Sequence, residues 1–350
     1  MSRIVEINGR LIGATHPTYI VAELSANHNQ DFDQAVALVR AAKDAGADAI
    51  KLQTYTPDTL TIRSDKDYFR IAGGTLWDGR TLYDLYAEAY TPWDWQPKLK
   101  AMANQLGLDL FSTAFDSTAV DFLEAMNVPV HKIASFEIGD IALIEKMSRT
   151  GKPLILSTGM ATLGEIEEAF GATVRAGATQ IALLKCTSAY PAPPEEMNLR
   201  TIPNLSDVFD VPVGLSDHTL GNAVAVAAVS LGACIVEKHF TLSRSTPGPD
   251  SAFSLEPQEF KAMVEGIRVA EKAIGGVHYG MSAKESESRS FRRSLFVVKD
   301  VKAGEVFTED NVRSIRPANG LAPKYLREVL GQKAACDIER ATPLDWKMIA

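Results

Sequence analysis

Residues 211–239 read VPVGLSDHTLGNAVAVAAVSLGACIVEKH and contain one complete strand–helix–strand unit. The apolar runs Val211–Asp217 and Ala233–His239 each end in polar residues, and the stretch Gly221–Leu231 between them favours a helix. Strands that are apolar throughout are typical of a parallel sheet covered on both faces. The segment therefore predicts two neighbouring parallel strands joined by a crossover helix.

The same pattern recurs towards the N-terminus. Six earlier apolar runs predict strands over Tyr19–Glu23, Ala47–Gln53, Leu108–Thr113, Val128–Ser135, Pro153–Thr158 and Gln180–Cys186. Amphipathic stretches such as 33–45, 117–127 and 164–176 lie between them. Eight alternations of strand and helix predict an α/β protein with a (β/α)8 TIM barrel.

Two segments fall outside this repeat. The second and third predicted strand ends are 60 residues apart, and the interval holds TYTPDTLTIRSDKDYF and GGTLWDGRTLYDLY. We interpret it as a side wall or lid on the catalytic face, with Tyr55, Leu60, Phe69 and Trp77 available to line a pocket. The alternatives are a solvated loop without a role, or aromatic residues that only pack the insert onto the barrel.

The C-terminal part changes character after a helix that ends near residue 274. GGVHYGMSAKESESRS is rich in Gly, Ser and charged residues, and short β-like pieces follow it. The sequence predicts a barrel over residues 1–276, a linker over 277–290 and a small β-rich domain over 291–350.

Charge and composition exclude several classes of protein. The 350 residues include 36 Lys and Arg against 44 Asp and Glu, a net charge of −8, which argues against a general nucleic-acid binder. The longest apolar run is too short to span a membrane, and the N-terminal MSRIVEINGR lacks the apolar core of a secretory signal. Three cysteines without a C-x-x-C pair indicate a reducing compartment, so we expect a cytoplasmic protein without membrane or nucleic-acid partners.

Polar residues follow all eight predicted strands, at the end where barrel enzymes place their active sites. One large polar site is the economical explanation. The candidates, in chain order, are Glu23, Lys51, Gln53, Thr113, Lys132, Ser135, Glu137, Ser157, Lys185, Thr187, Ser188, Tyr190, Ser216, Asp217, His218, Glu237 and His239.

The residue types suggest separate tasks within that site. His218 and His239 end adjacent strands, which lie about 4.8 Å apart, so both imidazoles can converge on one divalent cation such as Mn²⁺ or Mg²⁺. The alternative is two unrelated histidines with satisfied hydrogen bonds. Lys51, Lys132 and Lys185 can cradle a phosphate; each alone can equally be a surface lysine, and a Schiff-base lysine is a further alternative.

Three carboxylates complete the candidates from the residues alone. Glu23, Glu137 and Glu237 suit acid–base chemistry or ligation, although each can equally be only an ion-pair partner. Cys186 is interpreted as a small packed residue, because nothing near it in the sequence marks a nucleophile.

Eight motifs in order resemble the sialic acid synthase family, whose members condense phosphoenolpyruvate with an amino sugar. They are AELSANHN, KLQTY, HKIASFE, STGM, KCTSAYP, GLSDHTLG, VEKHFTL and GPDSAFSL. RRSLFV and IRPANGL in the tail resemble the family's C-terminal antifreeze-like (SAF) domain. The insert after the second strand, ASFE in place of GSGE, and Ser188 in place of Asn look most like the pseudaminic acid synthases of this family.

The resemblance implies roles for individual residues. It places a divalent metal (Mn²⁺, Mg²⁺ or Co²⁺) on His218 and His239, and phosphoenolpyruvate on Lys51, Lys132, Ser135 and Ser157. It gives Glu23, Gln53, Glu137, Tyr190 and Asp250 to the sugar or metal side. Arg316 resembles an arginine that reaches the sugar from a partner subunit, which implies a domain-swapped homodimer.

The resemblance also implies the reaction. The substrates expected are phosphoenolpyruvate and 2,4-diacetamido-2,4,6-trideoxy-altrose, and the products are pseudaminic acid and phosphate. A sialic or legionaminic acid synthase remains the alternative enzyme. A non-catalytic glycan-binding protein is the alternative of another class.

Overall fold

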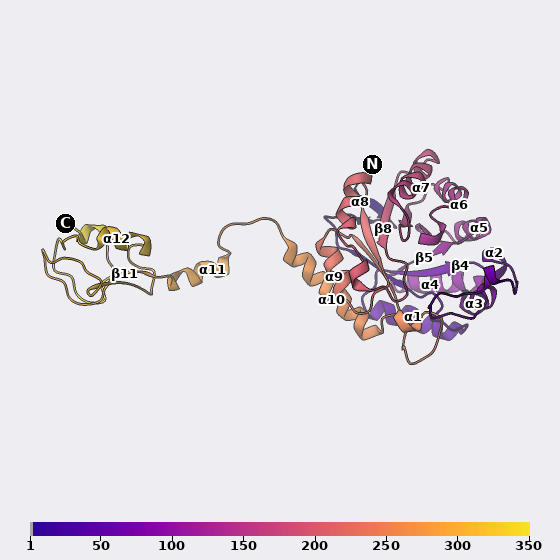
Figure 1. Ribbon diagram of the computed structural model, residues 1–350, viewed down its shortest axis with the longest axis horizontal. Helices are drawn as coiled ribbons and strands as arrows, with labels where there is room; N and C mark the ends of the chain where they lie inside the picture. The colour runs from indigo at the N-terminus through magenta and orange to yellow at the C-terminus, as the bar shows by residue number, and fades with distance from the viewer. Residues whose placement is uncertain (1–2) are drawn as a thin grey trace. The chain divides into compact units, whose positions relative to one another are not determined.

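The computed structural model describes residues 3–350 and divides into two compact units, Met1–Gly275 and Gly276–Ala350. In the first unit eight parallel strands close into a barrel in the order β10-β3-β4-β5-β6-β7-β8-β9. Figure 1 shows helices around this barrel. The predicted TIM barrel is thereby confirmed. The strands are β3 Tyr19–Glu23, β4 Ala49–Thr54, β5 Asp109–Ala114, β6 His131–Ile133, β7 Leu154–Ser157, β8 Ile181–Cys186, β9 Val213–Asp217 and β10 Ile235–His239.

Strand β6 is shorter than the sequence predicts. It covers only His131–Ile133 of the expected 128–135. Pro129 has no backbone N–H to donate to a ladder, and the chain turns into a 3-10 helix over Ser135–Glu137 directly after the strand. That early turn carries Ser135 and Glu137 over the mouth of the barrel.

The helices that cover the barrel begin at side-chain caps. Asp31 accepts hydrogen bonds from the backbone of Asp33 and Gln34, and Thr162 forms a capping box with Glu165. These helices are α1 Phe32–Asp44, α4 Gln96–Gln105, α5 Ser117–Ala125, α6 Ile141–Ser148, α7 Leu163–Arg175, α8 Thr201–Phe209, α9 Ala223–Ser230 and α10 Pro257–Ile274. No helix within residues 3–350 is both long and apolar enough to cross a membrane.

An N-terminal hairpin that the sequence analysis did not anticipate covers the amino-terminal end of the strands. Its strands are β1 Val5–Ile7 and β2 Arg10–Ile12, and the side chains of Val5, Ile7 and Ile12 are fully buried in the barrel's core. Its backbone and side chains bond Gln180 and Asp109, which lie at the amino-terminal ends of β8 and β5. The hairpin therefore covers the barrel's interior at this end.

The insert after β4 is folded. It contains α2 Pro57–Leu60, a 3-10 turn over Asp67–Phe69 and α3 Leu82–Ala89, and Arg70 and Thr81 form a β-bridge. Trp77 Nε1 donates a hydrogen bond of 2.9 Å to the carbonyl of Pro249, in the loop after β10. The insert thus spans from one strand end to another, as a wall does.

The second unit has its own core, which includes Leu295, Val297, Phe307 and Val329. Its antiparallel strands are β11 Ser294–Val297 and β12 Val312–Ile315, and its helices are α11 Ala283–Ser288 and α12 Leu326–Val329. Helix α11 lies within the segment predicted as a linker, where Ser282 and Glu285 form a capping box. Arg316 directly follows β12.

Candidate active site

The register of the closed barrel decides which strand-end side chains face its interior. Directly paired residues of parallel strands point to the same side, and neighbours along a strand alternate. Followed around all eight strands, the pairings place one set of side chains inside. The inward set is Glu23, Lys51, Gln53, Thr113, Lys132, Ser157, Cys186, Ser216, Glu237 and His239.

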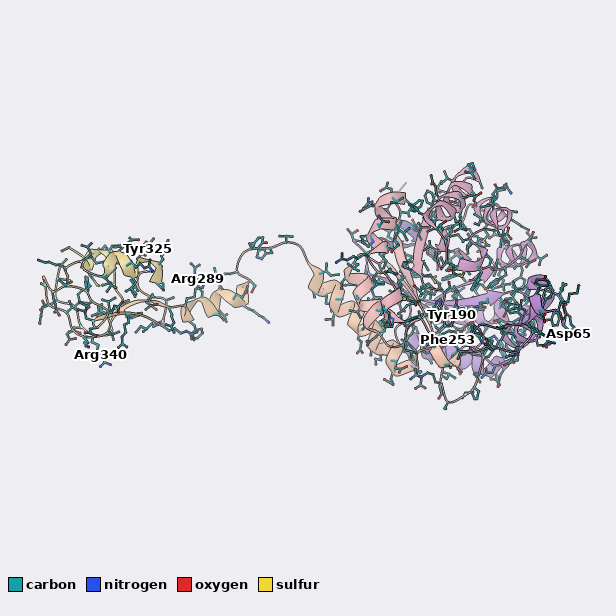
Figure 2. The ribbon with its side chains drawn as sticks, in the orientation of Figure 1. Asp65, Tyr190, Phe253, Arg289, Tyr325 and Arg340 are labelled. Carbon is teal, nitrogen blue, oxygen red and sulfur yellow. The ribbon has the colours of Figure 1, made fainter. Side chains whose placement is uncertain are left out.

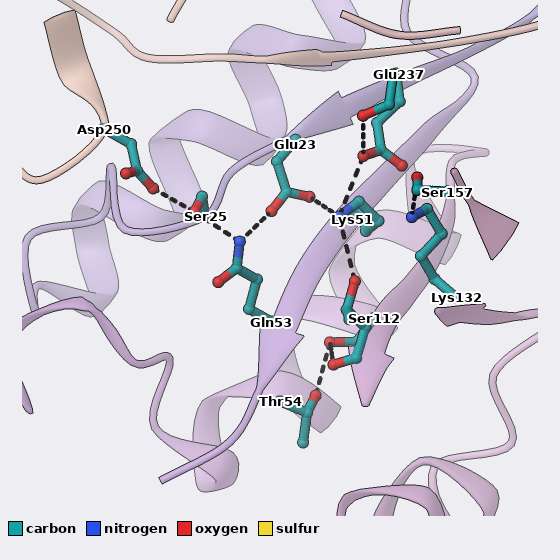
Figure 3. Close-up of polar contacts among 12 residues, drawn as sticks. Glu23, Ser25, Lys51, Gln53, Thr54, Ser112, Lys132, Ser157, Glu237 and Asp250 are labelled. Carbon is teal, nitrogen blue, oxygen red and sulfur yellow. Dashed lines mark hydrogen bonds and ion pairs between the residues drawn. The ribbon is translucent and has the colours of Figure 1, made fainter. Parts of the chain in front are cut away.

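Lys51 is the centre of this interior (Figure 3). Its Nζ lies 2.9 Å from Glu23 Oε2, 3.4 Å from Glu237 Oε1 and 3.3 Å from Thr113 Oγ1. Gln53 Nε2 donates to Glu23 Oε1 at 2.9 Å, and Ser216 Oγ donates to Glu237 Oε1 at 3.2 Å. One buried ammonium therefore forms ion pairs with two buried carboxylates.

The two carboxylates differ in acidity. Burial raises the pKa of Glu23 to about 7, against the lowering effect of Lys51, and the charge of Glu237 raises it further. The pKa of Glu237 is lowered overall. Burial acts to raise it, but the positive charges of Lys51 and Lys132 together have the larger effect. The pair can hold one charge and one exchangeable proton near neutral pH, which suits acid–base catalysis.

Lys132 lies on β6, two strands from Lys51 on β4, and differs from Lys51 in its partners. Its Nζ donates to Ser157 Oγ at 2.7 Å and to the carbonyl of Ile133 at 3.0 Å. Within residues 3–350 no carboxylate oxygen lies within 4.0 Å of it, and burial lowers its pKa. A buried ammonium with only neutral partners fits an anionic ligand.

Hydroxyl groups surround the turn beside Lys132. The Gly159 N–H donates to Ser135 Oγ at 3.1 Å. A Cβ at position 159 would lie 2.3 Å from Ser188 Oγ and 2.7 Å from Ser135 Oγ, so only glycine fits this close approach. The backbone amide, both serines, Ser157 and Lys132 form a compact set of donors, which we call the anion cradle.

His218 and His239 lie side by side, with ring centroids 5.4 Å apart. His218 Nδ1 donates to the Thr187 carbonyl at 2.9 Å, so Nε2 is the ring nitrogen left to face a ligand. His239 Nδ1 is buried without a hydrogen-bond partner among the described residues. Burial and the nearby charges of His218, Lys51 and Lys238 lower the pKa of His239 well below its usual range, so its ring is neutral.

This pair fits a divalent cation with two protein ligands. A neutral imidazole with an orphaned nitrogen, beside a second one oriented by a carbonyl, is a usual donor set for such an ion. In the described part of the chain no three His, Cys, Asp or Glu residues gather to hold a metal. Further ligands must then come from water or substrate.

A cavity of about 430 Å³ opens between the insert and the barrel mouth. The insert contributes Tyr55, Leu60, Trp77 and Tyr86 to its walls, and the barrel side contributes mainly polar groups. Those on the barrel side include Gln53, Glu137, Tyr190, His239 and Asp250. Phe69, expected in this wall, does not line the cavity.

Tyr190 joins the cavity to the histidines. Its ring centroid lies 4.3 Å from that of His218, 5.2 Å from that of Phe253 and 5.8 Å from that of Trp77. Figure 2 labels Tyr190 and Phe253 close together in the barrel. Asp250 accepts a short hydrogen bond from Ser25, and burial raises its pKa. The cavity thus has an aromatic side and a polar side.

Glu137 is an acidic residue on the barrel side of the cavity. Its Oε2 is buried and has no hydrogen-bond partner among residues 3–350. Burial raises the pKa of its carboxyl to about 7, although the charge of Lys132 lowers it. A carboxyl of this kind can donate a hydrogen bond to a ligand while it is protonated.

Two predicted candidates point away from this interior. Asp217 lies next to inward-facing Ser216, so it points outward, where its Oδ2 lies 2.7 Å from Lys238 Nζ. Lys185 pairs with Leu215 and also points outward, with its Nζ on the Cys186 carbonyl at 2.8 Å. We therefore remove Asp217 from the substrate-binding residues and Lys185 from the phosphate-binding candidates.

Cys186 is the residue that sequence reasoning assigned to packing and the register places in the interior. Its Sγ lies 3.9 Å from His218 Nδ1 and 3.8 Å from Ser188 Oγ. The signal was the alternation itself, since exactly one of Lys185 and Cys186 can face inward. Thr187 follows Cys186 in the chain, and its Oγ1 lies 3.3 Å from Lys185 Nζ.

Comparison with known proteins places this geometry among sugar-acid biosynthetic enzymes. The NeuB family matches residues 38–279, and the SAF domain matches residues 292–350. Pseudaminic acid synthase from Helicobacter pylori is 48% identical over 94% of this chain and 96% of its own length. The enzyme of the same name from Campylobacter jejuni is 47% identical over 92% of this chain and 93% of its own.

A solved structure agrees with the fold over the whole chain. The spore coat polysaccharide biosynthesis protein SpsE of Bacillus subtilis is 33% identical and covers 99% of both chains, with a TM-score of 0.67. The resemblance read from the eight motifs and from the tail is confirmed by these matches.

Proposed function

The chain belongs to the NeuB family, and on that premise we propose that it is a pseudaminic acid synthase. It condenses phosphoenolpyruvate with 2,4-diacetamido-2,4,6-trideoxy-altrose and water to give pseudaminic acid and phosphate. The observation that carries the proposal is the pairing of an anion cradle around Lys132 with an aromatic-walled cavity across the two histidines.

The reaction needs one carbon–carbon bond and one carbon–oxygen cleavage. The sugar opens to its aldehyde, and the methylene carbon of phosphoenolpyruvate attacks the aldehyde carbon. Water adds to the adjacent carbon, and the tetrahedral intermediate expels phosphate by cleavage of its C–O bond. The aldehyde oxygen gains a proton and the water loses its protons, so acid–base groups must lie on both sides of the new bond.

The chain's own residues suit these steps. Lys132, Ser135 and Ser157 hold the phosphate, and their donors are already fixed before it arrives. Lys51 holds the phosphoenolpyruvate carboxylate beside Glu23 and Glu237, which exchange a proton with the attacking water. Three neighbouring groups orient these side chains by hydrogen bonds. Lys51 bonds the Thr113 hydroxyl, Glu237 bonds the Ser216 hydroxyl, and His218 bonds the Thr187 carbonyl.

His218 and His239 hold a divalent cation. Synthases of the NeuB family depend on a metal in general, and we propose Mn²⁺, Mg²⁺ or Co²⁺ here because two imidazoles with open positions suit these ions. When bound, such an ion polarises the sugar's carbonyl as a Lewis acid. Gln53, Asp250 and Tyr190 lie on the same side and contact the open-chain sugar.

The SAF domain completes the site of a second subunit. We propose a domain-swapped homodimer in which Arg316 of one chain reaches the sugar bound to the other.

A chain ended after residue 290 should keep a folded barrel and lose most activity. Full turnover by the truncated chain contradicts the shared site. All three cysteines are unpaired, which agrees with a cytoplasmic enzyme.

The test is phosphate release from phosphoenolpyruvate against a panel of amino sugars. We expect release with the diacetamido-trideoxy sugar, and ¹⁸O placed in the bridging position should appear in the phosphate because the C–O bond breaks. No release with any sugar of the panel contradicts the enzyme class. Release only with N-acetylmannosamine or the legionaminic acid precursor changes the assigned sugar substrate and leaves the assigned reaction type unchanged.

A further inference from the structure

A buried ion pair lies behind the two histidines, on the outer face of the strands that carry them. Asp217 precedes His218, Lys238 precedes His239, and the two charged residues are register partners in β9 and β10. Lys238 Nζ lies 2.7 Å from Asp217 Oδ2, and both side chains are 0% exposed. Neither can touch a substrate in the barrel's interior.

The pair also holds the turn that carries His218. Asp217 Oδ1 accepts hydrogen bonds from the Thr219 backbone N–H at 2.9 Å and from its hydroxyl at 2.8 Å. Lys238 Nζ donates to the Thr219 carbonyl. The backbone on both sides of His218 is therefore tied to the residue that precedes His239.

Stability alone is a poor explanation for this cluster. Removing two charges from water is expensive, and apolar residues of similar size are often neutral or better in such positions. Apolar side chains would suit this position, since the neighbouring helix α9 consists almost entirely of Ala and Val. An ion pair with directed hydrogen bonds adds what apolar side chains lack, which is a fixed distance between two backbones.

We propose that Asp217, Thr219 and Lys238 are positioning residues for the metal-binding histidines. They hold the ends of β9 and β10 so that His218 and His239 present nitrogens to one cation. The Thr187 carbonyl fixes the ring of His218, and the cluster fixes the backbone beneath both rings. This inference rests on the proposed metal-dependent function.

The experiment measures Mn²⁺ binding to the metal-free full-length enzyme, with free Mn²⁺ followed by electron paramagnetic resonance. The double variant Asp217→Leu/Lys238→Met removes both charges and the ties to Thr219. We expect Mn²⁺ to bind about tenfold more weakly or worse. The melting temperature without metal should stay near that of the wild type, because the replacements fill the same space.

Kinetics separate positioning from a general structural role. The Mn²⁺ concentration for half-maximal rate should rise in parallel with the dissociation constant, while the rate at saturating Mn²⁺ returns towards wild type. The matched control is Lys146→Met/Asp121→Leu, an ion pair on the barrel surface whose N–O distance is 2.7 Å. It makes the same change in charge and should leave Mn²⁺ binding unchanged.

Unchanged Mn²⁺ affinity in the folded double variant overturns the proposal. Should that variant not fold, Thr219→Val keeps both charges and removes only the hydroxyl, and we expect about threefold weaker binding; unchanged binding there overturns it equally. His239→Ala distinguishes the two levels. Wild-type Mn²⁺ affinity in His239→Ala shows that the metal site itself is misassigned, whatever the positioning cluster does.

Discussion

The two walls of the site are built in different ways. The anion cradle stands on strand ends and a tight turn, with Lys132 and Ser157 on adjacent strands and Gly159 admitting two serine hydroxyls. The sugar wall stands on an insert, with Tyr55, Trp77 and Tyr86 carried by loops and short helices. The first wall is polar and set by barrel register, and the second is aromatic and set by its own packing.

This difference indicates a division of labour. A barrel fixes strand-end groups closely enough to bind a substrate common to a whole family, here phosphoenolpyruvate. A loop-built wall can change without disturbing the barrel, so it is where sugar specificity is expected to lie. Variants of each wall should then fail in different ways.

The largest effect is expected between the walls, at the histidines. His239→Ala or His218→Ala should lower activity about a thousandfold or more, because a lost Lewis acid costs several kcal/mol in the transition state. Rates across a Mn²⁺ titration measure this, with thermal melting as the control for folding. Full activity of His239→Ala without added metal contradicts the assignment.

The next effect concerns the cradle. Lys132→Met should raise KM for phosphoenolpyruvate about a hundredfold, since a charge-assisted contact to buried phosphate is lost. Preference between sugars should not change. The matched control is Lys185→Met, because Lys185 points outward and its removal changes charge equally. Similar losses in both variants mean that register does not decide the function of the lysines.

A smaller and opposite pattern is expected for the insert. Trp77→Ala should reduce the preference for the diacetamido-trideoxy sugar about tenfold, through lost apolar contact, and leave KM for phosphoenolpyruvate unchanged. Phe69→Ala changes an aromatic residue of the same insert that does not line the cavity, and should have little effect. Ratios of kcat/KM for the two sugars measure both. An unaltered ratio in Trp77→Ala removes this residue from the specificity wall.

The smallest effect is a pH dependence of stability at Glu137. Its pKa rises from 4.5 to about 7 in the folded protein through burial. A carboxyl with a raised pKa contributes stability fully below its unfolded pKa and loses it as pH rises through the folded pKa, here up to about 3 kcal/mol. Between pH 5 and pH 8, wild type should therefore lose a few degrees of melting temperature relative to Glu137→Gln. The raised pKa of Glu23 changes stability with pH in the same direction, but Glu23 is present in both proteins, so its effect cancels in the comparison. Parallel melting curves contradict the buried carboxyl.

The strand ends were predictable from sequence because apolar runs and polar ends repeat with a fixed period. All eight strands were found, and every strand-end residue of the inward set except Cys186 was a candidate. Adjacent polar residues were the limit: Asp217 and Ser216 both end β9, and only the register shows that Ser216 faces inward. A single-residue shift inverts the whole strand, and sequence does not reveal it.

The insert was less predictable for a physical reason. It has no repeat, so its aromatic residues could be named but not placed, and Trp77 reached the cavity whereas Phe69 did not. Its position depends on a distant contact, the hydrogen bond from Trp77 to the Pro249 carbonyl, for which no local pattern exists. The N-terminal hairpin was missed similarly, since its strands have only three residues each.

One competition experiment tests the central claim most directly. 2,4-Diacetamido-2,4,6-trideoxy-altrose and N-acetylmannosamine are offered together to limiting enzyme and phosphoenolpyruvate, and the two nine-carbon products are counted by mass. Two mismatched positions, each costing roughly 1–3 kcal/mol, predict about a hundredfold preference for the first sugar or more. Equal or greater use of N-acetylmannosamine contradicts the specificity proposed here and makes the protein a sialic acid synthase.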